Sequence, residues 1–220
     1  MKICGCDVSI NSPGLVKFEL DENLEIISTD FLGFTGVKKN LKLTDKVEFF
    51  SGKMFDNYLK KNWHVVDRMI DFISDCDYVA MEDYALQASG KVFHIAEMNG
   101  LFKHQIRKTY SDVKLRLIEP TTLKMFATDN GTADKYSMWE SFVDHDHSFD
   151  ISMLPPVEKR GGAAITSDIV DGFWLAEMLL TELKLRKGLI LLKDLTEKQI
   201  GAFQRTSKAN PENLLVRDYL

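Results

Sequence analysis

Apolar residues near the start of the chain fall into three short runs, over residues 2–9, 15–20 and 24–30. The turn-rich Asn11-Ser12-Pro13-Gly14 separates the first two runs, and the polar Asp21-Glu22-Asn23 separates the second from the third. Short apolar runs bounded by such breaks are typical of β-strands. The first thirty residues therefore predict an antiparallel meander of three strands.

The rest of the chain alternates helical and strand-like patterns. We expect strands at 78–82 and 114–118, and helices at about 55–74, 91–108, 121–127, 133–143, 168–186 and 197–203. The helix from 168 should end at Gly188, a residue type suited to a C-cap. From 31 to 53 the pattern loosens, which indicates a long loop or an inserted element. A meander followed by alternating helices and strands predicts an α/β fold, a mixed five-stranded sheet flanked by helices.

The helix expected over 91–108 has an unusually wide apolar surface. At 100° per residue its apolar residues cover roughly 220° of the circumference, whereas a surface helix needs a stripe of about 100°. These residues are Val92, Phe93, Ile95, Ala96, Met98, Phe102 and Ile106. We expect the helix to be buried on two sides, by its own sheet and by a second copy of the chain in a homodimer.

Size and composition indicate a single globular domain, with 220 residues, 45% of them apolar and 28% charged. No apolar run approaches the roughly 20 residues that span a bilayer, and the start of the chain lacks the apolar core of a secretory signal. Three cysteines, Cys4, Cys6 and Cys76, are too few and too irregular for a disulfide framework. We therefore expect a cytoplasmic protein with reduced thiols and no contact with a membrane.

Four acidic residues stand where a charge is unfavourable. Asp7 closes the first strand, Glu82 closes the strand from 78, and Asp168 and Asp171 open the most apolar helix. A carboxylate beside a core must be paired or must bind a metal, and none of these runs places a Lys or Arg next to its acid. The two helical acids are three residues apart, so their side chains project from one face of the helix. We expect both to lie in its first turn, where the helix dipole favours carboxylates. Carboxylate clusters bind Mg²⁺, and paired-metal sites serve phosphoryl transfer, so the sequence predicts a metal-dependent nuclease.

The net charge of −5 is not the basic balance that a nucleic-acid-binding protein usually shows. Binding depends on the local field rather than on the total, however. Between residues 101 and 124 the cations outnumber the acids; they are Lys103, Arg107, Lys108, Lys114, Arg116 and Lys124, against Asp112 and Glu119. We assign Lys103, Arg107 and Lys108 to DNA contact on this basis.

Four stretches of the chain occur in the order and spacing of a known family. They are Ile3-Cys4-Gly5-Cys6-Asp7-Val8-Ser9, Val79-Ala80-Met81-Glu82-Asp83-Tyr84, the segment 119–135 with Lys124 and Lys135, and the segment 167–176 with Asp168 and Asp171. Through them the chain resembles the RuvC-like Holliday junction resolvases of the RNase H-like superfamily, over roughly 1–30 and 76–187. The regions outside that match are suited to a phage or viral form of the enzyme.

The resemblance implies an endonuclease that resolves four-way DNA junctions by paired, symmetric phosphodiester hydrolysis, in DNA recombination and repair. It implies that Asp7, Glu82, Asp168 and Asp171 bind two Mg²⁺ ions per active site, with Mn²⁺ as a substitute. Lys124 and Lys135 correspond to the basic residues that the family sets against the scissile phosphate. Tyr84 corresponds to an aromatic residue that stacks on bases, although it stands one residue early. The enzyme would act as a homodimer, in the host cytoplasm if the chain is viral.

The chain departs from the family pattern in three places. Val8-Ser9-Ile10 replaces the usual Gly-Ser or Pro-Gly after the first aspartate, and regions of about 31–75 and 188–220 extend a single nuclease domain over 1–220. A flap or general branched-DNA nuclease of the same fold remains an alternative. An actin-like kinase or ATPase would need two Gly-rich phosphate loops, which the sequence lacks. A non-catalytic DNA-binding module should have lost an acid, whereas all four are present.

Overall fold

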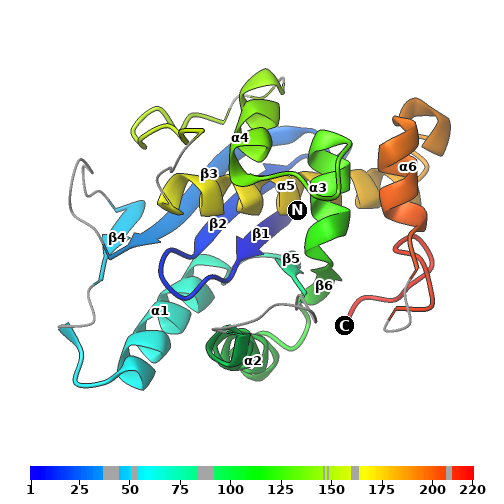
Figure 1. Ribbon diagram of the computed structural model, residues 1–220. Helices are drawn as coiled ribbons and strands as arrows, with labels where there is room; N and C mark the ends of the chain where they lie inside the picture. Colours follow the sequence, from blue (N-terminus) through cyan, green and yellow to red (C-terminus); the bar gives the residue numbers. More distant parts are fainter. Residues whose placement is uncertain are drawn as a thin grey trace.

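The computed structural model describes residues 1–36, 45–50, 54–83, 92–145, 147, 149–159, 164–206 and 210–220. Within these residues one mixed sheet has six strands, in the order β4-β3-β2-β1-β5-β6 (Figure 1). The strands are β1 Lys2–Asp7, β2 Gly14–Leu20, β3 Ile26–Thr35, β4 Val47–Phe49, β5 Tyr78–Glu82 and β6 Lys114–Ile118. Strands β1 to β3 pair in antiparallel fashion, and β1–β5, β5–β6 and β3–β4 are parallel.

The predicted mixed sheet, a meander continued by parallel strands, is confirmed, but the prediction of five strands is wrong. Strand β3 continues through Gly33 to Thr35, and the three-residue β4 pairs beside this extension. Glycine weakens a strand pattern, and a three-residue strand is too short to show a period. The end of β3 and the whole of β4 therefore could not be recognised in the segment 31–53, which was predicted as a loop or an inserted element.

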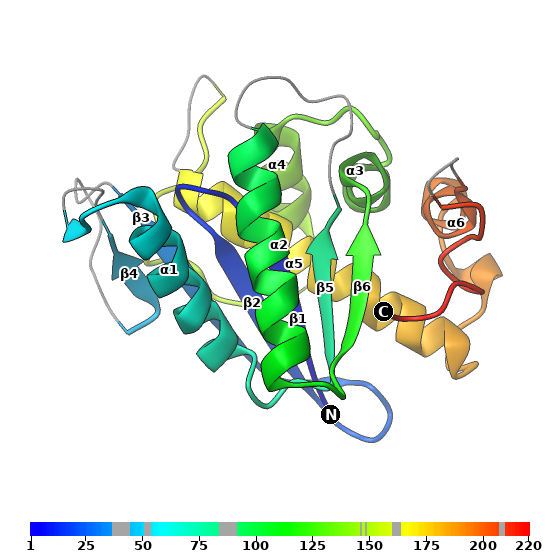
Figure 2. The same cartoon turned by 90° about the horizontal axis from the view of Figure 1, so that it is seen from below.

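Two helices cover one face of the sheet and the longest helix crosses the other (Figures 1 and 2). Helices α1 and α2 lie on the first face, and α5 lies on the second with α3 and α4 beside it. The helices are α1 Tyr58–Phe72, α2 Val92–Thr109, α3 Pro120–Thr128, α4 Lys135–Asp144, α5 Ala164–Arg186 and α6 Glu197–Gln204. The expected C-cap at Gly188 is confirmed by its φ of 70°.

Helix α5 begins at Ala164, and not at Asp168 as the sequence suggested. Its first turn contains no acidic residue. The placement of Asp168 and Asp171 in a first turn, favoured by the helix dipole, is therefore wrong. Both acids lie deeper in the helix, where the end effect of the dipole has faded.

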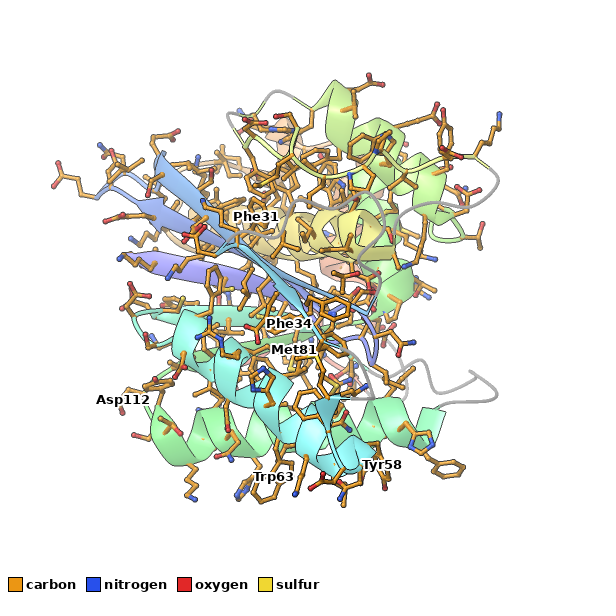
Figure 3. The ribbon with its side chains drawn as sticks, turned by 90° about the vertical axis from the view of Figure 1, so that its left-hand side faces the viewer. Phe31, Phe34, Tyr58, Trp63, Met81 and Asp112 are labelled. Atoms are coloured by element: carbon orange, nitrogen blue, oxygen red, sulfur yellow. The ribbon has the colours of Figure 1, made fainter. Side chains whose placement is uncertain are left out.

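Alternate residues of each central strand enter different cores, as the period of two requires. On the α5 side lie Ile3 and Ala80, and on the α1–α2 side lie Cys4, Cys6, Val79 and Met81. Figure 3 shows the same division on β3 and β5, where Phe31 lies on the α5 side and Phe34 and Met81 on the other. By this parity Asp7 and Glu82, which end β1 and β5, are on the face that α5 crosses.

Only one side of α2 is buried in the single chain. Met98, Phe102 and Ile106 are fully buried against the sheet and α1, whereas Phe93 is 86% exposed and Ile95 is 39% exposed. The expected burial by the chain's own sheet is confirmed. Burial of the second side by another copy stays a prediction.

The last residues of the chain lie along the edge of the sheet. Leu220 and Leu115 exchange two backbone hydrogen bonds, so the end of the chain pairs with β6. Arg116, counted above among the cations of residues 101–124, is 1% exposed and donates to both carboxylate oxygens of Glu182, at 3.0 and 2.6 Å. Its guanidinium also lies 4.1 Å from the ring centre of Tyr219. Arg116 therefore anchors the tail and adds nothing to a basic surface.

All three cysteines lie inside the fold. Cys4, Cys6 and Cys76 are buried and unpaired, and the sulfurs of Cys4 and Cys6 lie 3.6 Å apart on one face of β1. None of the helices in the described part of the chain combines the length and the hydropathy needed to cross a membrane.

Candidate metal centre

Asp7 and Glu82 lie at neighbouring strand ends. The parallel pairing of β1 and β5 places Cys6 opposite Met81, and the next residue of each strand is one of the two acids. Helix α5 can cross directly above because Gly14 lies under it: a Cβ on Gly14 would lie 2.4 Å from the backbone carbon and oxygen of Asp168. The acids of the sheet and of the helix are thus brought to one edge of the sheet.

Three of the four predicted acids form a tight cluster. One carboxylate oxygen from each of Asp7, Asp168 and Asp171 lies within 4.8 Å of the others. These are hard oxygen donors, as divalent cations such as Mg²⁺ prefer, and they carry more negative charge than their surroundings balance. The donor set therefore fits a metal ion. Glu82 lies outside this triplet but lines the same cavity.

Asp168 is 2% exposed and is hydrogen-bonded through both oxygens. Lys135 Nζ donates to Oδ1 at 2.6 Å, and the hydroxyls of Ser9 and Ser12 donate to Oδ2 at 2.7 and 2.5 Å. Ser167 Oγ lies 3.4 Å from Oδ1. A buried carboxylate with this many donors has a fixed orientation.

Burial and mutual repulsion change the proton affinity of the other acids. Burial raises the pKa of Glu82 to about 8, with a further contribution from Asp171. Burial likewise raises the pKa of Asp171 to about 7, against the opposing charge of Lys135. The pKa of Asp7 is raised well above its ordinary value by burial and by the neighbouring Asp168 and Glu82. These raised pKa values favour protonated Glu82 and Asp171 near neutral pH in the absence of a cation, and a bound cation would displace those protons.

The acids of the cluster change the pKa of Lys135. Partial desolvation of its ammonium by the surrounding protein lowers the pKa, but the charge of Asp168 and the hydrogen bond to it outweigh that effect and raise the pKa overall. Lys135 is therefore a permanent positive charge at the carboxylates, and Lys124 lines the same cavity from α3. Both predicted basic residues lie at the acids.

The cavity around the cluster has a volume of about 550 Å³. Its lining includes residues that the sequence did not single out, among them Ser9, Ser12, Asp83, Ile95 and Asn99. The serines follow Asp7 in a turn, and turn serines are common without any site nearby, so only the fold shows their position. Ile95 and Asn99 come from α2, whose first turns border the cavity.

Three residues predicted for DNA contact, Lys103, Arg107 and Lys108, do not line this cavity. Arg107 and Lys108 are 12 and 13 positions beyond Ile95 on α2, which places them roughly 18–20 Å further along the helix axis. Arg107 donates to the carbonyl oxygens of Ser111 and Val113, at 3.3 and 2.9 Å, and so holds the turn into β6. Tyr58 marks the start of α2, because its ring lies 5.6 Å from that of His94. In Figure 3 Asp112, in the turn after α2, lies on the opposite side of the molecule from Tyr58. Lys103 is half-buried midway along α2, and Tyr84 lies outside the described residues.

No family model matches the chain, and no curated protein matches it. Among solved structures, the chain is similar to RuvC of Thermus thermophilus, with 13% identity, a TM-score of 0.48 and coverage of 86% of this chain and 97% of that one. T. thermophilus RuvC in complex with a Holliday junction substrate gives 13% identity, a TM-score of 0.45 and coverage of 83% and 93%. Fowlpox virus resolvase with its substrate Holliday junction DNA gives 15% identity, a TM-score of 0.39 and coverage of 83% and 99%. At such identities no residue role passes from one protein to another.

Proposed function

We propose that the chain is a metal-dependent endonuclease that resolves four-way DNA junctions by paired, symmetric cuts. The observation that carries the proposal is the convergence of Asp7, Asp168 and Asp171 within 4.8 Å, beside Lys135 and in an open cavity. Metal ions bound by these carboxylates, together with the ammonium group of Lys135, would attract an anionic substrate such as a phosphodiester. The resemblance of the four sequence motifs to those of the RuvC-like resolvases implies that this substrate is branched DNA.

The acids and lysines of the cavity have separate roles in this reaction. Asp7, Asp168, Asp171 and Glu82 hold the cations, and Glu82 completes the set from the end of β5. Two Mg²⁺ ions, replaceable by Mn²⁺, would supply an activated water and stabilisation of the leaving oxygen. Lys124 and Lys135 balance the charge that develops on the phosphate in the transition state.

Paired cuts require two active sites, and we propose that a homodimer supplies them. A two-fold dimer matches the two-fold symmetry of a four-way junction. The exposed apolar residues Phe93 and Ile95 of α2, with Tyr58 and Trp63 of α1, give a surface for a second copy. In Figure 3 Tyr58 and Trp63 point away from the sheet. We propose the cytoplasm as the compartment, that of the host if the chain is viral.

The test is incubation of the purified protein with Mg²⁺ and labelled four-way, three-way, flap and linear duplex DNA. Symmetric nicks on the four-way junction, and none on the linear duplex, are expected. Equal cutting of flaps and three-way junctions would instead identify a general branched-DNA nuclease. Absence of cutting on every substrate, in both Mg²⁺ and Mn²⁺, would refute the proposed function.

A further inference from the structure

The loop between β1 and β2 covers one oxygen of the Asp168 carboxylate. Ser9 Oγ donates to Asp168 Oδ2 at 2.7 Å, and Ser12 Oγ donates to the same oxygen at 2.5 Å. Ser12 is 5% exposed, and its backbone N–H donates to Ser9 Oγ at 3.2 Å. The two hydroxyls therefore form one connected group directed at a single oxygen.

The other oxygen of Asp168 has a partner of a different kind. Oδ1 accepts from Lys135 Nζ, whose side chain is 60% exposed and extends from α4. Ser167 Oγ lies 3.4 Å from the same oxygen, but it has a closer acceptor in the carbonyl oxygen of Ala164, at 2.9 Å. An exposed lysine with a flexible side chain can turn its ammonium toward another anion. The hydroxyl of the buried Ser12 cannot reach solvent and so keeps its hydrogen bond to Oδ2. Oδ1 is thus the oxygen at which a cation can be exchanged, and Oδ2 is the oxygen that is held.

The loop is held in place from outside the acid cluster. Lys61 Nζ on α1 donates to the carbonyl oxygen of Ile10 at 2.9 Å, and the backbone N–H of Phe34 on β3 donates to that of Pro13 at 3.1 Å. Gly14 then lies in direct contact with the backbone of Asp168. Because its anchors are α1 and β3, the loop can orient Asp168 whether or not a cation is bound.

We propose that Ser9 and Ser12 are positioning residues, which hold Oδ2 of Asp168 so that Oδ1 is presented to the cation. This deepens the proposed function, on which it rests for the use of the cluster as a divalent-cation site. Hydrogen bonds to a ligating carboxylate orient it and offset its burial. Their loss should therefore weaken cation binding before any DNA is involved.

The test measures Mn²⁺ affinity of the full chain by titration calorimetry, without DNA. Ser9→Ala and Ser12→Ala are each expected to raise the Kd by about 10-fold or more. Ser9→Thr keeps the hydroxyl at a half-buried position and should retain the wild-type Kd. Ser28→Ala is the matched control, because Ser28 also donates to a carboxylate, that of Glu19 at 3.1 Å, but on the exposed part of β3.

Thermal unfolding in EDTA separates positioning from simple support of the fold. A lower melting temperature with an unchanged Kd in both alanine variants would overturn the proposal, and so would absence of Mn²⁺ binding by the wild-type protein. If Ser12→Ala does not fold, the pair Ser9→Ala and Ser9→Thr decides. Failure of the proposed function gives a different result: Mn²⁺ binds, the serine variants weaken it, and no branched DNA is cut.

Discussion

Gly5 of β1 and Gly172 of α5 face each other where the helix crosses the sheet, and a Cβ on Gly5 would lie 2.0 Å from the carbonyl oxygen of Gly172. Gly5 precedes Asp7 by two residues, and Gly172 directly follows Asp171. The contact of the two backbones therefore sets the separation between the acid of the strand and the acids of the helix.

Gly5→Ala should destabilise the protein by about 1–3 kcal/mol, because the added methyl overlaps backbone atoms that no side-chain rotation can move. Gly100→Ala is the control, because a Cβ at this exposed position of α2 meets nothing within 4 Å. Alanine there should raise the free energy of unfolding by about 0.5–1 kcal/mol. Urea unfolding measures both. A Gly5→Ala variant as stable as the wild-type protein would mean that α5 lies further from β1 than described.

Asp7→Asn and Glu82→Gln should each lower cleavage by on the order of 10³-fold while branched-DNA binding is retained. Both changes remove a ligand charge with almost no change in volume. Glu97→Gln, an exposed acid on α2, is the control and should cleave normally. Cleavage rates in Mg²⁺ and gel-shift affinities in Ca²⁺ separate the two effects, and near-normal cleavage by either variant would argue against the assigned ligands.

The metal-free protein should lose stability as the pH rises. The folded-state pKa is about 7 for Asp171 and about 8 for Glu82, above the ordinary values of 3.8 and 4.5. Folding therefore favours the protonated groups, a contribution that is complete below pH of about 4 and is lost as the pH passes 7 to 8. The melting temperature in EDTA should fall from about pH 5 to about pH 9.

Two conditions should reduce this fall. Saturating Mg²⁺ favours the ionised carboxylates and stabilises the folded state at high pH, and Glu82→Gln removes one of the titrating groups. Scans in EDTA and in Mg²⁺ across the pH range check both effects. Identical pH profiles for the wild-type protein and Glu82→Gln would show that Glu82 does not titrate with the raised pKa.

Lys124→Ala and Lys135→Ala should lower the cleavage rate of bound junction by about 10²-fold each, with a smaller effect on affinity. A cation beside the reacting phosphate acts on the chemical step, whereas a distant one acts on binding and its salt dependence. Lys108→Ala, at the far end of α2, should leave the rate unchanged. Single-turnover measurements at saturating enzyme isolate chemistry, and wild-type rates for both cavity variants would exclude a catalytic role for these lysines.

The proposed dimer should depend on Phe93. Phe93→Asp places a charge on the apolar surface of α2 and should convert the dimer to a monomer at micromolar concentration. Val216→Asp changes a residue that is 63% exposed on the C-terminal tail, outside α1 and α2, and should leave the dimer intact. Light scattering measures the mass of each. A wild-type protein that is monomeric throughout would remove the dimer from the proposal.

The sequence predicted most helices and strands because their apolar periods are strong. The parity of Ile3, Gly5 and Asp7 on β1 is also a sequence property, so the orientation of Asp7 toward one face could be anticipated. Contacts between distant elements could not be predicted in this way. No local pattern shows that α5 crosses β1 at Gly172, or that Ser12 contacts Asp168. Contacts between residues over 150 positions apart depend on the whole packing.

Arg116 shows the same limit for charge. In the sequence it is one of several cations between 101 and 124, whereas in the fold it is buried against Glu182 and Tyr219. Counting charges along the chain does not separate a cation that meets solvent from one that holds a core element. Asp7 and Glu82 were easier to place because each closes a strand, where burial follows from the local pattern, whereas Asp168 and Asp171 lie inside α5 and not at its start.

The pairing of Leu220 with Leu115 covers part of an outer strand of the sheet. β6 is the outermost strand on its side, and an uncovered outer strand offers a row of amide and carbonyl groups to any other extended chain. Here the protein's own tail takes up part of that row, and Arg116 holds the tail from beneath by donating to the carbonyl oxygens of Arg217 and Asp218. The last residues of the chain thus cover part of this edge, and we expect a chain shortened before Leu220 to associate more readily through β6.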